Sequence, residues 1–383
     1  MESRAALCSI RIRSTELKDP QPLLIRPGTS EIYPYTAYGY VQVASGEPIE
    51  FFCSKSLDWP FSGKKSVTAF CMEGSWYKIG DNEYHISEFR CLSWPDFIGK
   101  STGSRCSSGN LIDVGFELNG KRFIKEYEVC FDENEEVTRY VYHTLDRASN
   151  YYATGVDQIK FAHGGFFASK KVDKLYTPEV QKETINKALG MDASRYINSD
   201  ANRFLTRGLL AAETDFAYTP EQRSAFMFIN AAPQWQSFNV GNWARVVEGV
   251  KEWATKTGKK LDCWTGVWGV TTLPNKVAKQ TPLYLSYDEQ GNGLIPVPKI
   301  FFRVIIEPAT QKGIVLVGVN NPYLSTGEIE NGYILCKDVS DRINWINWKR
   351  NIISAGYSYA CEVMEFRRKV INLPQFKVSG LLV

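Results

Sequence analysis

The first third of the chain shows a strand-like alternation of apolar and polar residues. Short alternating runs occur at 50–53, 66–70 and 111–116, and Gly, Pro and Ser turns separate them. A period of two places the apolar side chains on one face of a strand, and such runs between turns are typical of all-β folds. We therefore predict an N-terminal β-rich domain at residues 1–125, a sandwich or barrel that contains disulfides.

After residue 126 the pattern changes to strands mixed with helices. We predict strands at 137–144, 225–230, 299–307 and 313–319. Helices are expected at 178–189, between Pro178 and the stop signal Gly190, at 239–256, and at 339–355. The helix at 239–256 has the clearest periodicity, because Trp243, Val246 and Val250 recur on one face. The elements lack a regular βαβ alternation, so residues 126–383 are predicted to form an α+β domain with a mixed or antiparallel sheet flanked by helices.

The composition is that of a globular protein, with 44% hydrophobic and 23% charged residues. No apolar run approaches the ~18–20 residues that span a bilayer, so we do not expect a membrane protein. The net charge is +3, from 45 basic and 42 acidic residues. A balanced total still allows binding to a polyanion, because the local field matters more than the sum.

The cysteines and histidines exclude a zinc site of the usual spacing. The nine cysteines include no Cys-x-x-Cys pair, and only three histidines are present. Scattered cysteines indicate disulfides and an oxidising compartment, with one thiol left over. The spacing leaves the disulfide pairing open.

Three sequence motifs follow one another within about fifty residues. The first is Thr206-Arg207-Gly208-Leu209. The second begins at Asn230, at the end of the predicted strand, and reads Asn-Ala-Ala-Pro-Gln. The third, Asn-Val-Gly-Asn-Trp, begins at Asn239 and opens the predicted helix. Together they predict a strand, a second strand and then a helix.

These motifs resemble those of the DNA/RNA non-specific endonucleases. That family has the patterns Arg-Gly-His, Asn-x-x-Pro-Gln and Asn-x-Gly-x-Trp, and this chain matches all of them except the histidine. The resemblance covers roughly residues 130–365 and implies a ββα-metal nuclease core. The similarity is greatest to secreted arthropod members, which include degenerate nucleases in the saliva of blood-feeding flies such as tsetse. It therefore implies an extracellular protein, with saliva as its source.

The resemblance also implies roles for individual residues. Arg207 would clamp a phosphate, and Asn230 would support the site from the second strand. Asn239 would bind one Mg²⁺ ion, which keeps most of its water ligands. The position of Asn239 also suits a helix N-cap. Lys160 is the nearest candidate for a further arginine of the family, and Lys160, Lys170 and Lys171 are candidate nucleic-acid contacts.

Two departures from the family pattern affect catalysis. Leu209 stands where the family has its general-base histidine, and a hydrocarbon cannot accept a proton. General-base catalysis is worth ~10²–10⁴ in rate. Val247 stands where members usually have a glutamate, and the next carboxylate, Glu248, is rotated by ~100° around the helix.

We therefore hypothesise a secreted, nuclease-like protein that binds DNA and RNA without sequence preference and cleaves them poorly or not at all. One alternative is an active Mg²⁺-dependent nuclease whose base is His163 or a metal-bound water. Others are an engineered inactive variant of such an enzyme and a scaffold without nucleic-acid contacts. Nothing in the sequence indicates an oligomeric state.

Overall fold

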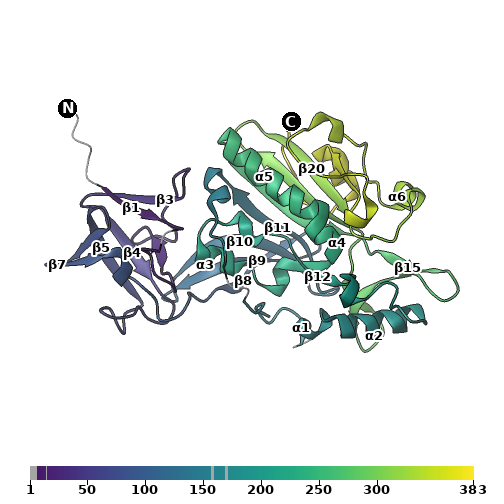
Figure 1. Ribbon diagram of the computed structural model, residues 1–383, viewed down its shortest axis with the longest axis horizontal. Coiled ribbons are helices and arrows are strands. Elements are labelled where there is room, and N and C mark those ends of the chain that lie inside the picture. The colour runs from purple at the N-terminus through teal and green to yellow at the C-terminus, as the bar shows by residue number, and fades with distance from the viewer. Residues whose placement is uncertain (1–6, 14, 157–158, 169–170) are drawn as a thin grey trace.

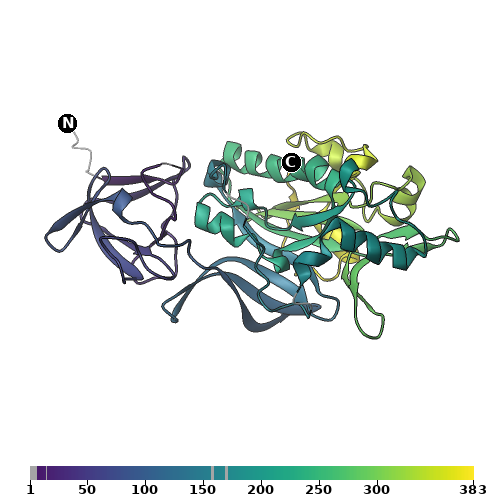
Figure 2. The same cartoon turned by 60° about the horizontal axis from the view of Figure 1, so that its bottom comes forward.

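The structure is a computed structural model, and it describes residues 7–13, 15–156, 159–168 and 171–383. Two β-rich bodies of unequal size lie side by side along its longest axis (Figure 1). The smaller one is N-terminal, and Figure 2 shows it at one end of the molecule, apart from the large sheet and its helices.

The N-terminal body contains two small antiparallel sheets. One pairs β1 with β3, and the other has the strand order β2-β4-β5-β6-β7. The disulfide Cys8–Cys71 joins the two sheets, and Cys53–Cys91 ties β4 to the chain that leaves the body. The strands are β1 (Leu7–Arg11), β2 (Leu23–Ile25), β3 (Tyr40–Ala44), β4 (Pro48–Phe52), β5 (Ser66–Glu73), β6 (Trp76–Ile79) and β7 (Asn82–His85).

The larger body is built on a nine-stranded sheet. Its strand order is β21-β20-β19-β14-β11-β10-β9-β8, with antiparallel neighbours, and β22 pairs in parallel with β20. The bounds are β8 (Ile98–Cys106), β9 (Gly109–Leu118), β10 (Arg122–Asp132), β11 (Val137–Leu145), β14 (Leu261–Trp268), β19 (Ile300–Glu307), β20 (Lys312–Val319), β21 (Ser358–Cys361) and β22 (Gly380–Leu381). The predicted strands at 137–144, 299–307 and 313–319 are confirmed as β11, β19 and β20.

The predicted α+β class is confirmed, because helices cover this sheet on both faces. The helix α5 (Ala244–Thr257) lies across one face (Figure 1) and packs Val246, Val250 and Ala254 into the main core cluster. On the other face, α7 (Val363–Lys369) packs Val363 and Phe366 against strand residues such as Val304. The predicted domain boundary between residues 125 and 126 falls within β10, and the division into two domains stays a prediction.

Smaller elements surround the sheet. They are α1 (Val172–Leu175), α2 (Pro178–Leu189), α3 (Thr219–Ser224), α6 (Thr326–Gly332) and the hairpins formed by β15 (Thr272–Pro274) with β16 (Gln280–Pro282) and by β17 (Tyr284–Tyr287) with β18 (Gly293–Pro296). The bounds of α2 are those predicted, and Gly190 ends it with a φ of 63°. The disulfides Cys106–Cys130 and Cys336–Cys361 lie in the larger body, and Cys263 is the single free, buried thiol. Among the described residues, no helix combines the length and hydropathy needed to cross a membrane.

The predicted helix at 339–355 is wrong. Only two single 3-10 turns form there, η7 (Ser340–Arg342) and η8 (Ile353–Ala355). The cause is the buried side chain of Asn242, which accepts a hydrogen bond from the Lys349 amide and donates to the carbonyls of Lys349 and Gly356. These bonds hold the segment extended beside α5, so tertiary contacts override the helical pattern.

The predicted strand at 225–230 is also wrong. Residues 228–230 form the 3-10 turn η5 (Phe228–Asn230), and the second strand starts one residue later. All of residues 225–230 are buried, and periodicity does not distinguish a buried strand from a buried turn. The side chain of Asn230 closes the turn by donating to the Ala225 carbonyl.

Candidate functional site

The three motifs meet in a strand–strand–helix unit. The strands β12 (Leu205–Leu209) and β13 (Ala231–Trp235) pair antiparallel, with Arg207 opposite Pro233. The chain then turns directly into α4 (Gln236–Phe238), the π-helical turn η6 (Asn239–Trp243) and α5. This order confirms the predicted ββα core.

Asn239 does not cap the helix, so the N-cap role suggested for it is wrong. Helical structure already begins at Gln236, and Asn239 has helical dihedrals of −56° and −49°. The helix is bent at Gly241, which has non-helical dihedrals and packs against η8. A Cβ on Gly241 would lie 2.6 Å from the Ala355 carbonyl oxygen, so only glycine fits this close approach.

The unit borders a hollow of about 630 Å³. Four residues that the sequence singled out line it together: Arg207 and Leu209 from β12, Asn239 from η6, and Val247 from α5. The lining also includes Thr206, Thr214, Glu213, Glu248, Lys251 and the aromatic residues Tyr152, Phe161, Phe226 and Trp243. The two departures from the family pattern, Leu209 and Val247, therefore lie in the same hollow as the matching residues Arg207 and Asn239.

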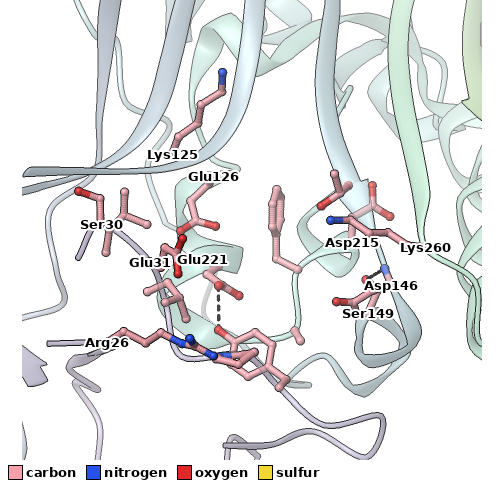
Figure 3. Close-up of a pocket in the computed structure, with 17 residues that line it drawn as sticks. Arg26, Ser30, Glu31, Lys125, Glu126, Asp146, Ser149, Asp215, Glu221 and Lys260 are labelled. Carbon is pink, nitrogen blue, oxygen red and sulfur yellow. Dashed lines mark hydrogen bonds between the residues drawn. The ribbon is translucent and has the colours of Figure 1, made fainter. Parts of the chain in front are cut away.

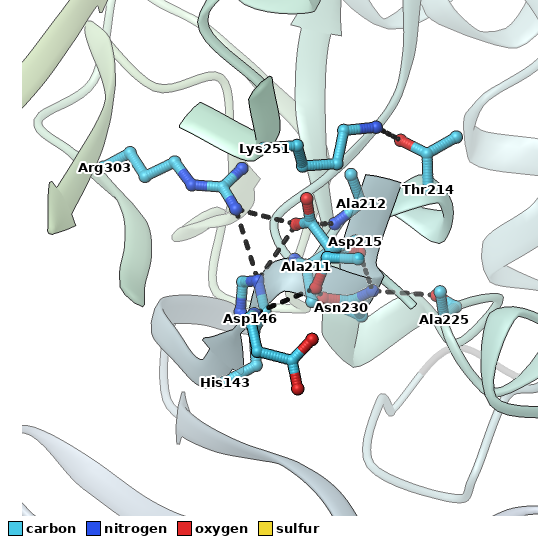
Figure 4. A network of polar contacts seen from close by, with 11 residues as sticks. His143, Asp146, Ala211, Ala212, Thr214, Asp215, Ala225, Asn230, Lys251 and Arg303 are labelled. Carbon is cyan, nitrogen blue, oxygen red and sulfur yellow. Dashed lines mark hydrogen bonds and ion pairs between the residues drawn. The ribbon is translucent and has the colours of Figure 1, made fainter. Parts of the chain in front are cut away.

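Asn230 lies behind this hollow and does not line it. Its side chain is fully buried and makes a reciprocal pair of 2.9 Å hydrogen bonds with the amide and carbonyl of Ala211. These bonds fix the chain two residues beyond Leu209 (Figure 4). Asn230 thus holds the end of β12 in place.

Of the three candidate lysines, none lines the hollow among the described residues. Lys160 is exposed between the lining residues Ile159 and Phe161, and Lys171 is exposed at the start of α1. Lys170 lies outside the described residues. Their contact with nucleic acid stays a prediction.

Lys251 is a cation of the hollow that sequence reasoning missed. It is 3% exposed, donates a 2.6 Å hydrogen bond to Thr214 Oγ1, and places Nζ 4.4 Å from the ring centroid of Tyr152. Burial lowers its pKa, although the charge of Asp215 opposes this shift. The helical period could have identified Lys251, because it follows Val247 by four residues on α5 and so shares its face.

The polar groups in the lining carry mixed charge. Arg207 is exposed and lies over the ring of Phe161, 4.8 Å from its centroid. Burial raises the pKa of Glu213, and Lys251 partly offsets this rise. Arg207 and Lys251 are therefore two cations in the lining of one hollow, one from β12 and one from α5.

A buried ion network lies beside the hollow (Figure 4). Asp215 Oδ2 accepts hydrogen bonds from Arg303 at 2.8 Å and from the Ala212 amide at 3.1 Å, and it lies 2.9 Å from His143 Nε2. Burial alone would raise the pKa of Asp215, but Arg303 and His143 bring it far below its usual range. Burial lowers the pKa of His143, so its neutral form is favoured.

No histidine lines the hollow among its described lining residues. His143 has no exposed side-chain surface, and His85 belongs to β7 of the N-terminal body. His163 accepts a hydrogen bond from the Gly165 amide and packs against Phe167. An imidazole base is thus absent from the described lining.

Magnesium binding at Asn239 stays a prediction, because an ion that keeps most of its waters needs few protein ligands. Mg²⁺ prefers six oxygen ligands in octahedral geometry. The hollow offers the Asn239 amide and the carboxylates of Glu213 and Glu248, but the ammonium of Lys251 shares it. Within the described parts of the chain, no three His, Cys, Asp or Glu side chains are grouped so that they could hold a metal.

A second hollow, of about 560 Å³, lies between the N-terminal body and the large sheet (Figure 3). Its lining includes the acidic residues Glu31, Glu126, Asp146, Asp215 and Glu221. Tyr35 of the N-terminal body donates a 2.8 Å hydrogen bond to Glu221 of α3. Burial raises the pKa of Glu221 to about 7 and raises that of Glu126 as well.

The ββα unit and the residues of its hollow define a protein of the ββα nuclease class. Residues 107–366 match the family model described as DNA/RNA non-specific endonuclease, so the chain belongs to that family. Members of this family hydrolyse phosphodiester bonds, typically with Mg²⁺.

The chain is similar to salivary proteins of insects. It is 29% identical to a salivary endonuclease of Lutzomyia longipalpis over 376 residues, covering 96% of this chain and 85% of that protein. It is 24% identical to salivary protein Tsal2A of Glossina morsitans morsitans, with 84% of this chain and 80% of that protein covered. It also resembles a solved EndoG/EndoGI complex, with 19% identity, a TM-score of 0.35, and coverage of 54% and 76% of the two chains.

Proposed function

We propose that this protein binds DNA and RNA without sequence preference through phosphate contacts, and that its cleavage of them is lost or strongly reduced. The observation that carries this proposal is Leu209, which lines the hollow together with Arg207 and Asn239. Hydrolysis needs a group that removes a proton from the attacking water, and a leucine cannot do so. Val247 is a second hydrocarbon in the same lining.

The cations of the hollow support the binding half of the proposal. Arg207 presents a guanidinium, which matches a phosphate with two parallel hydrogen bonds. Lys251, in the lining of the same hollow, adds an ammonium from α5. Both attract the backbone of any nucleic acid and read no base, so binding is expected to weaken steeply with salt.

The relatives and the disulfides support a secreted protein. The similar proteins of Lutzomyia and Glossina are salivary, and four disulfides are typical of an oxidising compartment. We therefore place this protein outside the cell and propose saliva as its source.

A mobility-shift series against salt, run beside plasmid digestion with Mg²⁺, tests both halves. The proposal expects shifted DNA and RNA at low salt and an intact plasmid. Digestion that Asn239→Ala abolishes would instead identify an active Mg²⁺-dependent nuclease, a reading favoured by the name of the Lutzomyia relative. The absence of any shift at low salt would indicate a scaffold without nucleic-acid contacts.

The substitution Leu209→His sharpens the test of the catalytic half. If the missing base limits the reaction, this variant digests plasmid ~10²–10⁴-fold faster than the parent protein. The matched control is Leu209→Gln, which adds polarity without a base and should remain inactive. If only Leu209→His combined with Val247→Glu is active, the lost glutamate also limits the reaction.

A further inference from the structure

A groove of about 680 Å³, separate from the two hollows, lies where the N-terminal body meets α3. Its charged lining is mostly basic, with Arg11, Arg13, Lys18 and Arg223 against the single acidic residue Asp19. Trp94 adds an aromatic ring, and the guanidinium of Arg223 lies 4.6 Å from its centroid. Neither the family motifs nor the hollow of the candidate site includes these residues.

Within the described residues, three of these cations have no acidic side chain close enough to form an ion pair. Arg11, Arg13 and Lys18 are exposed, and no carboxylate of the described chain lies within 4 Å of their charged atoms. Arg122 and Arg139 of the large sheet, in contrast, both pair with carboxylates. Like charges that line one groove raise the local concentration of anions.

Tyr152 connects this groove with the hollow of the candidate site. It lines that hollow, and the next residues, Ala153 to Val156, line the groove. Its ring contacts a cation of each region, since Lys251 Nζ lies 4.4 Å and the Arg13 guanidinium 5.9 Å from the ring centroid. The two regions are therefore neighbours around one aromatic side chain.

The connecting segment is held firmly in place. The buried side chain of Gln222 in α3 accepts a hydrogen bond from the Ala153 amide at 3.2 Å and donates one to its carbonyl at 3.1 Å. This reciprocal pair resembles the hydrogen bonding between two strands, and it fixes the backbone next to Tyr152. The segment that joins the hollow to the groove is therefore held by hydrogen bonds to α3.

We propose that the groove binds the backbone of a nucleic-acid strand whose neighbouring nucleotides occupy the hollow of the candidate site. Arg11, Arg13 and Lys18 contact successive phosphates, and Trp94 offers a surface for a base. A basic groove with an aromatic side chain is the combination that binds single strands without sequence preference. This inference rests on the proposed function and extends it to the N-terminal body.

The test compares two single-stranded oligonucleotides by fluorescence anisotropy at several salt concentrations. One of about 30 nucleotides can span the hollow and the groove, and one of about 6 cannot fill both. In the triple variant Arg11→Gln, Arg13→Gln, Lys18→Gln, the salt dependence of log K for the long strand should become shallower by about 2, at ~0.7 for each lost phosphate contact. The salt dependence of log K for the short strand should change much less.

The matched control is the triple variant Lys64→Gln, Lys65→Gln, Lys78→Gln, which removes the same charge from exposed positions of the N-terminal body outside the groove. The same loss in the control, or an equal loss for both strand lengths, would overturn the inference. Binding of neither strand by the parent protein would instead overturn the proposed function. Thermal melting of both variants checks that each remains folded.

Discussion

The hollow of the candidate site and the buried network beside it show opposite uses of charged groups. The stretch that follows β12 contributes to both, with Glu213 and Thr214 in the hollow and Asp215 in the network. In the network, Asp215 and Arg303 have no exposed side-chain surface, and Arg303 Nη2 pairs directly with Asp215 Oδ2 at 2.8 Å. In the hollow, Arg207 is exposed, and Leu209 and Val247 present hydrocarbon to the space beside it.

This difference shows that a perturbed pKa does not by itself mark the reactive site. The pKa of Asp215 is far below its usual range, yet its partners are buried with it. His143 could act as a base in solution, but its burial keeps it from any substrate. We therefore expect the network to serve the fold, while the hollow, with milder electrostatics, is open to a ligand.

The largest expected effect is on the free energy of unfolding, and it separates the role of the network from that of the hollow. Arg303→Met leaves Asp215 buried without its guanidinium partner, and breaking a buried ion pair in this way costs ~3–5 kcal/mol. Urea unfolding measures the loss. Arg245→Met is the control, because Arg245 reaches only a carbonyl, that of Asn347, at the surface. A loss below about 1 kcal/mol for Arg303→Met would contradict a stabilising role for the network.

A second prediction concerns the pH dependence of stability, and it involves the acidic hollow between the two bodies. The pKa of Glu221 is about 7 in the fold, against 4.5 in the unfolded chain. The native state thus holds the proton more tightly, so the contribution of Glu221 to stability is complete below pH 4.5 and is lost as the pH rises through 7. This difference amounts to about 3 kcal/mol at 1.36 kcal/mol per unit.

The measurement is urea unfolding at a series of pH values. Glu221→Gln keeps an oxygen that can accept the hydrogen bond from Tyr35 and cannot ionise, so it should reduce the slope of the profile between pH 5 and 8. The slope that remains belongs to the buried Glu126, whose pKa is also raised. The exposed Glu117 provides the control Glu117→Gln, which should retain the slope. A parent protein whose stability is constant over this range would refute the assignment to Glu221.

Local signals in the sequence predicted the elements whose patterns agree with their surroundings. Helix α2 follows from its Pro178 start and Gly190 stop, and β19 and β20 from their apolar runs. The extended segment at 339–355 could not be predicted, because its backbone partner is the side chain of Asn242, about a hundred residues earlier. Long-range hydrogen bonds of this kind leave no local pattern.

The candidate site shows the same limit of prediction from local sequence. The motifs identified Arg207, Leu209 and Asn239, which the fold brings into one hollow. They did not identify Tyr152, because it lies in an irregular segment far from the motifs. Its place in the hollow depends on the bonds between Ala153 and Gln222, which only the tertiary structure supplies.

A third effect tests whether the hollow binds phosphate. Arg207→Gln removes the exposed guanidinium and should reduce the salt slope for single-stranded DNA by ~0.7, with weaker binding at every salt concentration. Lys251→Met should do the same if its ammonium reaches the ligand. The control Lys260→Gln removes a charge that lines the acidic hollow instead. Equal slopes for Arg207→Gln and the parent protein would show that Arg207 does not contact the nucleic acid.

The smallest expected effect concerns the thiol beside the network. Burial raises the pKa of Cys263 to about 12, although Arg303 opposes this rise. Because the thiolate is the reactive form, a thiol reagent at pH 8 should leave the native protein almost unlabelled. In denaturant without reductant, one thiol per chain should react, since the other eight cysteines form four disulfides. Arg303→Met should label faster than the parent protein because its network opens more often. Rapid labelling of the native parent protein would show instead that the network is accessible to solvent, and the contrast with the hollow would then disappear.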